Sequence, residues 1–277
     1  MTLDEFIQLS LQEDIGDGDH SSLACIPKEA QGKAKLLVKE EGVLAGLEIA
    51  KAIFRKADEN LIIEQLLNDG DSVKPDDIAF YVSGSSQSIL KTERLVLNIM
   101  QRMSGIADIT RKMTAELEGL NTRILDTRKT TPLLRFLEKE AVKIGGGVNH
   151  RMGLYDMIML KDNHLDYAGG VKQAIEKTHL YLQSTGKNLK IEVEARDLNE
   201  LEEILAVGKI DRIMLDNFSF DDLRTAVKRI SGKYETEASG GITIKTLRQY
   251  GECGVDYISV GALTHSVKSL DLSLKAC

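Results

Sequence analysis

The sequence predicts an α/β protein made of a β/α barrel and a smaller N-terminal α+β domain, and three patterns point to this fold. From Thr122 onward, short β-branched runs alternate with stretches of helical apolar spacing. Polar and charged residues follow nearly every one of these runs, where a β/α barrel carries its active site. Residues 1–107 lack this alternation, which indicates a separate domain.

The alternating part of the chain contains six clear strands, and helices lie between them. The strands are predicted at residues 123–127, 156–160, 189–194, 211–215, 234–238 and 255–260. The helices are predicted at residues 133–144, 171–183, 198–207, 220–230 and 244–250. Apolar strands covered by amphipathic helices form a parallel sheet, and this many successive units favour a closed barrel over an open doubly wound sheet. A seventh short strand at Gly147-Val148-Asn149 is left open, because periodicity alone does not establish it.

The N-terminal domain, residues 1–107, mixes helices and strands without a repeating order. Helices are predicted over 3–11 and 91–103, and strands over 32–39 and 78–82. Turn sequences such as Asn68-Asp69-Gly70 separate the strand-like segments. The domain boundary is expected near Gly105, which leaves residues 108–264 for the barrel.

The composition excludes several function classes. A formal net charge of −7 argues against a surface that wraps nucleic acid, because such a surface needs a broad basic field. No apolar run approaches the length that spans a bilayer, and no secretory signal pattern opens the sequence, so we expect neither membrane insertion nor secretion. Cys25, Cys253 and Cys277 are far apart and show no CxxC spacing, which predicts a reduced, cytoplasmic protein.

A cationic cluster stands out against this acidic background. Arg128 and Lys129 follow the first barrel strand, Lys161 ends the second, and His150 and Arg151 lie shortly before the second. Because the carboxyl ends of barrel strands meet at one face, we expect these side chains to converge on an anion-binding pocket.

Carboxylates and glycines belong to the later strands. Glu192 and Glu194 lie on one face of their strand, and a carboxylate buried there needs a cationic partner. Two interpretations remain open: a salt bridge to a pocket lysine, or a magnesium or ribose contact shared with Asp216. Backbone N–H groups of Ser239-Gly240-Gly241 and Gly261-Ala262 are predicted to bind a phosphate, with plain tight turns as the alternative.

Several sequence strings together resemble the quinolinate phosphoribosyltransferase family. The strings are Glu13 to Gly16, Glu93-Arg94, Gln101 to Ala107, Asp126 to Pro132, Gly145 to Arg151, Leu160 to His164, Glu192 to Glu194, Leu215 to Asn217 and Glu237 to Gly241. They cover nearly the whole chain, and their order and content are highly specific. The chain departs from the family pattern at Leu133, where glycine is common, and at Asp108, where threonine is common. We expect small geometric effects from both departures.

The resemblance implies an incomplete, seven-stranded β/α barrel with an N-terminal open α/β sandwich that the C-terminal tail, residues 265–277, completes. It implies phosphoribosyl transfer from phosphoribosyl pyrophosphate to quinolinate with decarboxylation, which gives nicotinate mononucleotide, pyrophosphate and carbon dioxide in NAD biosynthesis. Mg²⁺ is the implied cofactor. The implied assembly is a homodimer in which the sandwich of one subunit covers the barrel mouth of the other, and a hexamer is left open.

The resemblance also implies roles for individual residues. Quinolinate would be held by Arg128, His150, Arg151 and Lys161, with Arg102 reaching in from the partner subunit. Phosphoribosyl pyrophosphate would be held by Lys129, Glu194, Asp216, Ser239, Gly240, Gly241, Gly261 and Ala262. Glu194 and Asp216 would bind Mg²⁺ directly or through water, and the catalytic residues would be Lys129, Lys161, Glu194 and Asp216.

Two alternatives come from other function classes. Lys161 at a strand end is also the position of a Schiff-base lysine in a barrel aldolase. A molybdenum-related paralogue of the same fold, or a non-catalytic anion-binding protein, is the second alternative. The complete set of dicarboxylate-binding residues argues against the paralogue and the anion-binding protein, and borohydride trapping with carbonyl compounds would distinguish the aldolase from the transferase.

Overall fold

The computed structural model covers residues 1–277 and divides into two units. Unit 1 comprises Met1–Arg111, Thr131–Gly146 and Ser266–Cys277, and unit 2 comprises Lys112–Thr130 and Gly147–His265. These units differ from the ranges expected from the sequence mainly at residues 131–146, which group with unit 1. None of the helices combines the length and the apolar character needed to cross a membrane.

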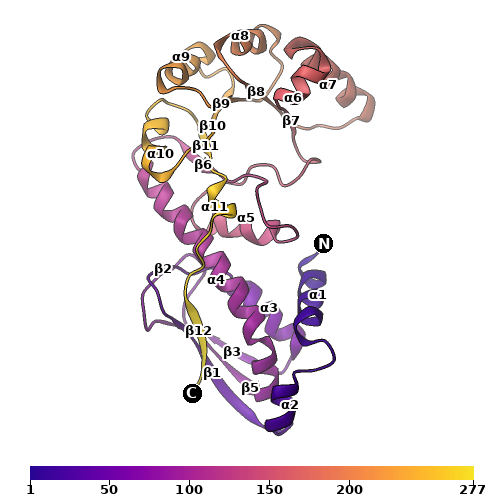
Figure 1. The fold of residues 1–277 in the computed structure, drawn as a ribbon, viewed down its shortest axis with the longest axis vertical. Helices are drawn as coiled ribbons and strands as arrows, with labels where there is room; N and C mark the ends of the chain where they lie inside the picture. Colours follow the sequence, from indigo (N-terminus) through magenta and orange to yellow (C-terminus); the bar gives the residue numbers. More distant parts are fainter. The chain divides into compact units, whose positions relative to one another are not determined.

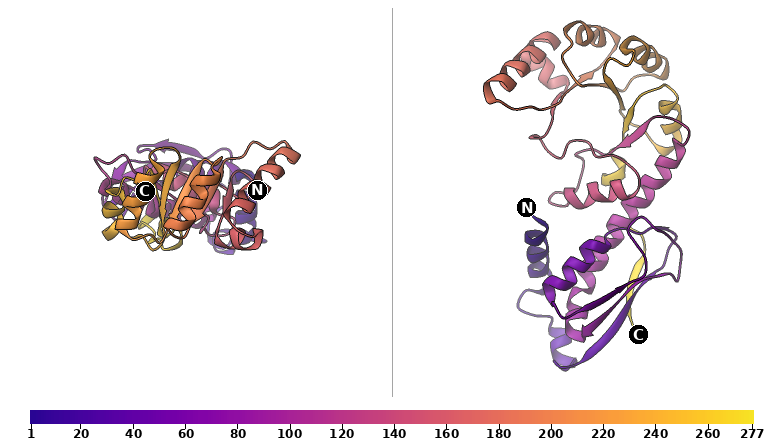
Figure 2. Two further views of the ribbon diagram at one scale, coloured as in Figure 1. Left: turned by 90° about the horizontal axis from the view of Figure 1, so that it is seen from above. Right: turned by 180° about the vertical axis from the view of Figure 1, so that it is seen from behind.

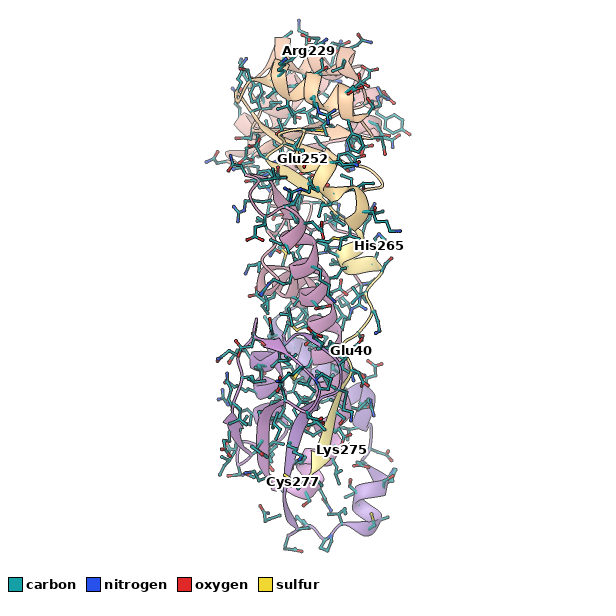
Figure 3. The ribbon with its side chains drawn as sticks, turned by 90° about the vertical axis from the view of Figure 1, so that its left-hand side faces the viewer. Glu40, Arg229, Glu252, His265, Lys275 and Cys277 are labelled. Carbon is teal, nitrogen blue, oxygen red and sulfur yellow. The ribbon has the colours of Figure 1, made fainter.

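Unit 1 is organised by a four-stranded antiparallel sheet in the order β12-β1-β5-β3. Its strands are β1 (Gln31–Val38), β3 (Ile62–Gln65), β5 (Ile78–Ser85) and β12 (Leu272–Ala276), beside the short pair β2 (Gly42–Val43) and β4 (Ser72–Val73). Its helices are α1 (Leu3–Ile15), α2 (His20–Cys25), α3 (Leu47–Ala57), α5 (Arg135–Ile144) and most of α4 (Ser86–Glu116). Phe54 of α3 packs edge-on against Phe80 of β5, so α3 covers one face of the sheet (Figure 1). The C-terminal tail completes the sheet as expected, because Leu272 to Ala276 pair with β1 (Figure 3).

Helix α4 extends the predicted helix in both directions and runs through Gly105. A Cβ atom at Gly105 would lie 2.2 Å from the carbonyl oxygen of Lys268. Glycine is therefore needed at this position because the C-terminal segment passes close to the helix, and it does not end the helix.

Unit 2 contains a six-stranded parallel sheet in the order β6-β11-β10-β9-β8-β7. The strands are β6 (Arg123–Leu125), β7 (Ile158–Leu160), β8 (Ile191–Ala195), β9 (Arg212–Asp216), β10 (Glu235–Ser239) and β11 (Tyr257–Ser259), so all six predicted strands are confirmed. Strands β6 and β7 stand at the two ends of this order, so the closed barrel favoured by periodicity is corrected to an incomplete one, as the resemblance implied. At the expected seventh strand, Val148 makes a single parallel bridge to Leu125. The ladder stops there because the backbone N–H of His150 donates to the side chain of Asp126.

Helices of unit 2 lie along the outer side of the curved sheet (Figures 1 and 2). They are α6 (Asp162–Ala168), α7 (Val171–Thr185), α8 (Leu198–Val207), α9 (Phe220–Ile230) and α10 (Ile244–Gly251), and the short helix α11 (Ala262–His265) follows β11 outside this row. Asp197 and Ser219 accept backbone hydrogen bonds at the starts of α8 and α9 and so fix where these helices begin. This arrangement leaves the carboxyl ends of the strands to form the site.

Candidate active site

The inner face of the barrel sheet carries charged groups at several levels. In-register pairs join Glu192 and Glu235 to Arg212, Glu194 and Glu237 to Met214, and Ser239 to Asp216. Because alternate residues of a strand share one face, the side chains of these pairs lie together on the inner side of the barrel.

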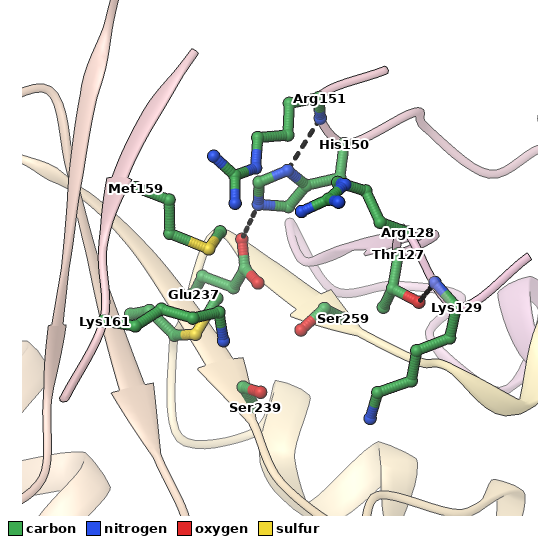
Figure 4. A pocket seen from close by; sticks show the side chains of 11 residues that line it. Thr127, Arg128, Lys129, His150, Arg151, Met159, Lys161, Glu237, Ser239 and Ser259 are labelled. Atoms are coloured by element: carbon green, nitrogen blue, oxygen red, sulfur yellow. Dashed lines mark hydrogen bonds and ion pairs between the residues drawn. The ribbon is translucent and has the colours of Figure 1, made fainter. Parts of the chain in front are cut away.

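A cavity of about 320 Å³ opens at this face (Figure 4). It is lined by Thr127, Arg128, Lys129, His150, Arg151, Met159, Lys161, Met214, Glu237, Ser239 and Ser259. The structure thus brings together the five predicted cationic side chains of the barrel and Ser239. The other predicted barrel residues, Glu194, Asp216, Gly240, Gly241, Gly261 and Ala262, lie outside this lining.

Two arginines approach each other in the cavity. Burial, and then the nearby charge of Arg128, lower the pKa of Arg151. Nη1 of Arg151 donates to the carbonyl oxygen of Met157 at 3.1 Å, which helps to hold the guanidinium. Like charges in a partly buried cavity are costly unless an anion joins them, so the site favours a ligand with carboxylate or phosphate groups.

The buried carboxylate Glu194 pairs with a pocket lysine. Its Oε2 lies 3.2 Å from Nζ of Lys161, so the salt bridge that the sequence left open is present. On the next strand, Asp216 accepts a hydrogen bond from Nδ2 of Asn217 at 2.6 Å. Glu194 and Asp216 offer oxygen ligands from adjacent strands, which suits Mg²⁺, and the magnesium site stays a prediction.

The predicted phosphate-binding segments are shaped by glycine. Gly240 has a φ of 105°, and a Cβ there would lie 2.1 Å from Oδ1 of Asn217. A Cβ at Gly261 would lie 2.9 Å from Cδ of Lys129, so the backbone passes directly beside that lysine. The hydroxyl of Thr264 donates to the carbonyl oxygen of Lys129 at 2.8 Å. These close approaches exclude side chains and leave backbone groups beside a cation, as an anion site requires.

Sequence reasoning missed most of a buried ionic group, of which His150 and Glu237 also line the cavity. Nε2 of His150 lies 2.9 Å from Oε2 of Glu192 and 3.3 Å from Oε2 of Glu237, and all three side chains are buried. Nη1 of Arg212 donates to Oε2 of Glu237 at 3.2 Å. A signal for Glu237 was present, because it lies two residues before Ser239 and therefore on the same face of β10.

Protonation in this group is governed by burial and by the two carboxylates. Nδ1 of His150 accepts the backbone N–H of Arg151, so the ring is neutral and its Nε2–H faces the carboxylates of Glu192 and Glu237. Burial, and then the charge of Glu237, raise the pKa of Glu192 to about 7. The ligand atoms of the three residues lie within 4.8 Å of one another, a spacing that would suit a metal ion. Arg212 already donates to Glu237, so its guanidinium and one shared proton neutralise the two carboxylates without a metal ion.

Arg102, the predicted residue from outside the barrel, lies on α4 in unit 1. Its Nε donates to Oε1 of Glu138 at 2.7 Å, and its Nη2 donates to the hydroxyl of Thr131 at 2.9 Å. Glu138 is 1% exposed and also accepts the backbone N–H of Thr131 at 3.1 Å. The structure therefore orients Arg102 through α5 and does not place it among the residues that line the cavity.

Comparison with known sequences matches both parts of the chain. The quinolinate phosphoribosyl transferase N-terminal domain matches residues 19–104, and the C-terminal domain of the same name matches residues 106–275. Quinolinate phosphoribosyltransferase (decarboxylating) 1b of Nicotiana tabacum is 46% identical over 284 residues, which cover 97% of this chain and 81% of that protein. A probable nicotinate-nucleotide pyrophosphorylase (carboxylating) of Bacillus subtilis is 45% identical over 264 residues, which cover 95% of this chain and 89% of that protein.

Solved structures show the same likeness. NadC from Streptococcus pyogenes superposes with a TM-score of 0.94 at 40% identity, covering 99% of this chain and 95% of that one. Nicotinate-nucleotide pyrophosphorylase from Ehrlichia chaffeensis gives a TM-score of 0.93 at 34% identity, covering 100% of this chain and 99% of that one. With both domains matched and these relatives aligned over nearly their whole length, the chain belongs to the quinolinate phosphoribosyltransferase family.

Proposed function

We infer that the chain is a decarboxylating quinolinate phosphoribosyltransferase of NAD biosynthesis, a phosphoribosyltransferase that makes nicotinate mononucleotide. The observation that carries this inference is the approach of Arg128 and Arg151 in one cavity with Lys161. Quinolinate brings two carboxylates on adjacent ring carbons, which meet this concentration of positive charge. The decarboxylating relatives over nearly the whole chain support the same reaction.

The residues of the cavity perform the reaction mainly by orientation. Arg128, Arg151 and Lys161 bind the two carboxylates and hold the ring so that its nitrogen attacks C1 of the ribose. The bond from C1 to pyrophosphate breaks, and its electron pair leaves with the pyrophosphate. The ring nitrogen is then positive, so when carbon dioxide leaves, the electron pair that stays on C2 is stabilised by the ring itself until C2 takes up a proton.

The second substrate fits the segments that adjoin the cavity at Lys129 and Ser239. We propose that Lys129 and the backbone of Ser239, Gly240, Gly241, Gly261 and Ala262 bind phosphoribosyl pyrophosphate. Glu194 and Asp216 would hold Mg²⁺, directly or through water, and that ion supplies positive charge to the departing pyrophosphate. The oxygen ligands on adjacent strands support this assignment.

We also propose a cytoplasmic homodimer whose active site includes Arg102 of the partner subunit, with a hexamer left open. The guanidinium of Arg102 is ordered by Glu138 while its side chain remains 28% exposed, which suits a group that meets a second chain. The three cysteines are free thiols, which supports a reducing compartment.

A labelled-substrate assay tests the proposed function. Quinolinate labelled in the carboxyl group at C2 should release labelled carbon dioxide only when phosphoribosyl pyrophosphate and Mg²⁺ are both present. Nicotinate, which lacks that carboxylate, should be a poor phosphoribosyl acceptor. Release without phosphoribosyl pyrophosphate, or equal use of nicotinate, would contradict the proposed reaction.

A further inference from the structure

The buried ionic group lies next to the place where the barrel is incomplete. Val148 makes only a single bridge to β6, and the residues that follow it belong to no strand. The backbone of Arg151 is therefore not fixed by a ladder of hydrogen bonds, although its guanidinium lies in the cavity. Something other than a neighbouring strand must hold it.

We propose that Glu192 and Glu237 are positioning residues for quinolinate recognition, which hold the ring of His150 and through it the backbone of Arg151. This inference rests on the proposed function, because it concerns how the quinolinate carboxylates are recognised. It assigns His150 to positioning, whereas the family resemblance implied direct contact with quinolinate.

The first step of the argument is that the two carboxylates are rigid. Both side chains are 0% exposed and come from ladder residues of β8 and β10, the strands on either side of β9. Arg212 of β9 is buried, donates to Glu237 and so fixes that carboxylate from below. Their oxygens face Nε2 of His150 from two directions.

The second step is that the ring transmits this position to Arg151. The backbone N–H of Arg151 donates to Nδ1 of His150 at 2.7 Å, and Figure 4 shows the ring between that N–H and Glu237. The backbone N–H of His150 donates to Oδ1 of Asp126 at 2.8 Å, and Asp126 lies two residues before Arg128. The contacts of His150 thus link the segments that carry both arginines.

The third step is the effect that a displacement of Arg151 would have on quinolinate binding. Both ring nitrogens of His150 face protein groups, so the ring contributes to recognition mainly through where it places Arg151. Binding two adjacent carboxylates needs the two guanidinium groups at a fixed spacing, so a displacement of Arg151 weakens its charge-assisted bonds to quinolinate. The carboxylates therefore act on quinolinate binding through His150 and Arg151.

The test compares Glu237→Met, which keeps the size of the side chain and removes the oxygens, with Glu237→Gln, which keeps one oxygen for Nε2. We expect Glu237→Met to raise the KM for quinolinate about tenfold or more, with kcat and the KM for phosphoribosyl pyrophosphate changed less than about twofold. Glu237→Gln should recover most of the loss. Glu235→Gln is the matched control, because Glu235 also binds Arg212 from β10, at 2.9 Å, but its side chain is 37% exposed. It should leave the KM for quinolinate unchanged.

A double-mutant cycle separates positioning from a general structural role. If Glu237 acts through Arg151, Glu237→Met should add less than about twofold to the KM for quinolinate in an Arg151→Lys background. Full additivity, equal losses for both substrates, or an equal effect of Glu235→Gln would overturn the proposal. If Glu237→Met does not fold, quinolinate binding to Glu192→Met by calorimetry decides, and wild-type affinity in that variant would overturn it. A wild-type chain that releases no carbon dioxide from quinolinate would overturn the proposed function as well, whereas active wild type with an unaffected Glu237→Met variant would overturn the positioning role alone.

Discussion

The cavity and the glycine segments beside it are built to recognise anions by different means. The quinolinate side uses long charged side chains of the cavity lining, Arg128, Arg151 and Lys161, whereas the phosphoribosyl pyrophosphate side depends on glycines outside that lining, such as Gly240 and Gly261. Quinolinate binding should weaken when side-chain atoms are removed, whereas phosphoribosyl pyrophosphate binding should weaken when side-chain atoms are added to the glycines. This difference determines which substitutions will test each side.

The largest effect is expected when a side chain is removed from the quinolinate side. Arg128→Ala and Arg151→Ala each should lower kcat/KM for quinolinate at least about a hundredfold, equivalent to about 3 kcal/mol, because each removes charge-assisted bonds to a carboxylate. Steady-state kinetics with each substrate varied in turn would measure this. A loss confined to phosphoribosyl pyrophosphate would reverse the assignment of the two sides.

A mixing experiment asks whether the quinolinate side is complete within one chain. Arg102→Ala and Lys161→Ala homodimers should each be nearly inactive, because each lacks one member of every site. After refolding and exchange at equal amounts, about half of the dimers are hybrids with one intact site, so about a quarter of wild-type activity should return. If verified hybrids stay inactive, Arg102 serves its own subunit or no site at all.

Glu194 and Asp216 on the phosphoribosyl pyrophosphate side should affect binding of that substrate much more than binding of quinolinate. The paired change Glu194→Gln with Asp216→Asn should weaken use of phosphoribosyl pyrophosphate about tenfold more than quinolinate binding, and a divalent metal should be required. Calorimetry of each ligand, with and without Mg²⁺, would measure both affinities. Equal losses for the two ligands would show that these carboxylates are structural.

On the phosphoribosyl pyrophosphate side, a single methyl group added to a glycine should weaken substrate binding. Gly240→Ala adds a Cβ that would lie 2.1 Å from Oδ1 of Asn217, so we expect the KM for phosphoribosyl pyrophosphate to rise about tenfold while quinolinate binding is retained. Gly232→Ala is the control, since Gly232 also has a positive φ of 71° but nothing lies within 4 Å of its Cβ position. If the two substitutions had equal effects, backbone strain alone would explain them, and the close contact with Asn217 would have no role.

The sequence predicted what local patterns specify. All six barrel strands were found, because each is a short β-branched run between helices of clear apolar spacing. Convergence of Arg128, Lys129 and Lys161 followed from one rule, that the strand ends of a barrel share a face.

The features that were missed depend on contacts between distant segments. Glu138 meets Arg102 only because α4 and α5 pack together. Glycine is required at position 105 because the carbonyl oxygen of Lys268, near the C-terminus, passes close to it. Glu237 and Arg212 lie in strands buried on both faces, where a charged residue gives no polar alternation to reveal its partner.

The pairing of β12 with β1 has a consequence for how the protein is made. Strand β1 is among the first segments to leave the ribosome, but its partner Leu272–Ala276 is synthesised after the entire barrel. Until then the nascent sheet exposes an unpaired edge on β1, the kind of edge that recruits other chains. Lys33 and Lys35 on β1 place positive charge along that edge, a common protection against aggregation during synthesis.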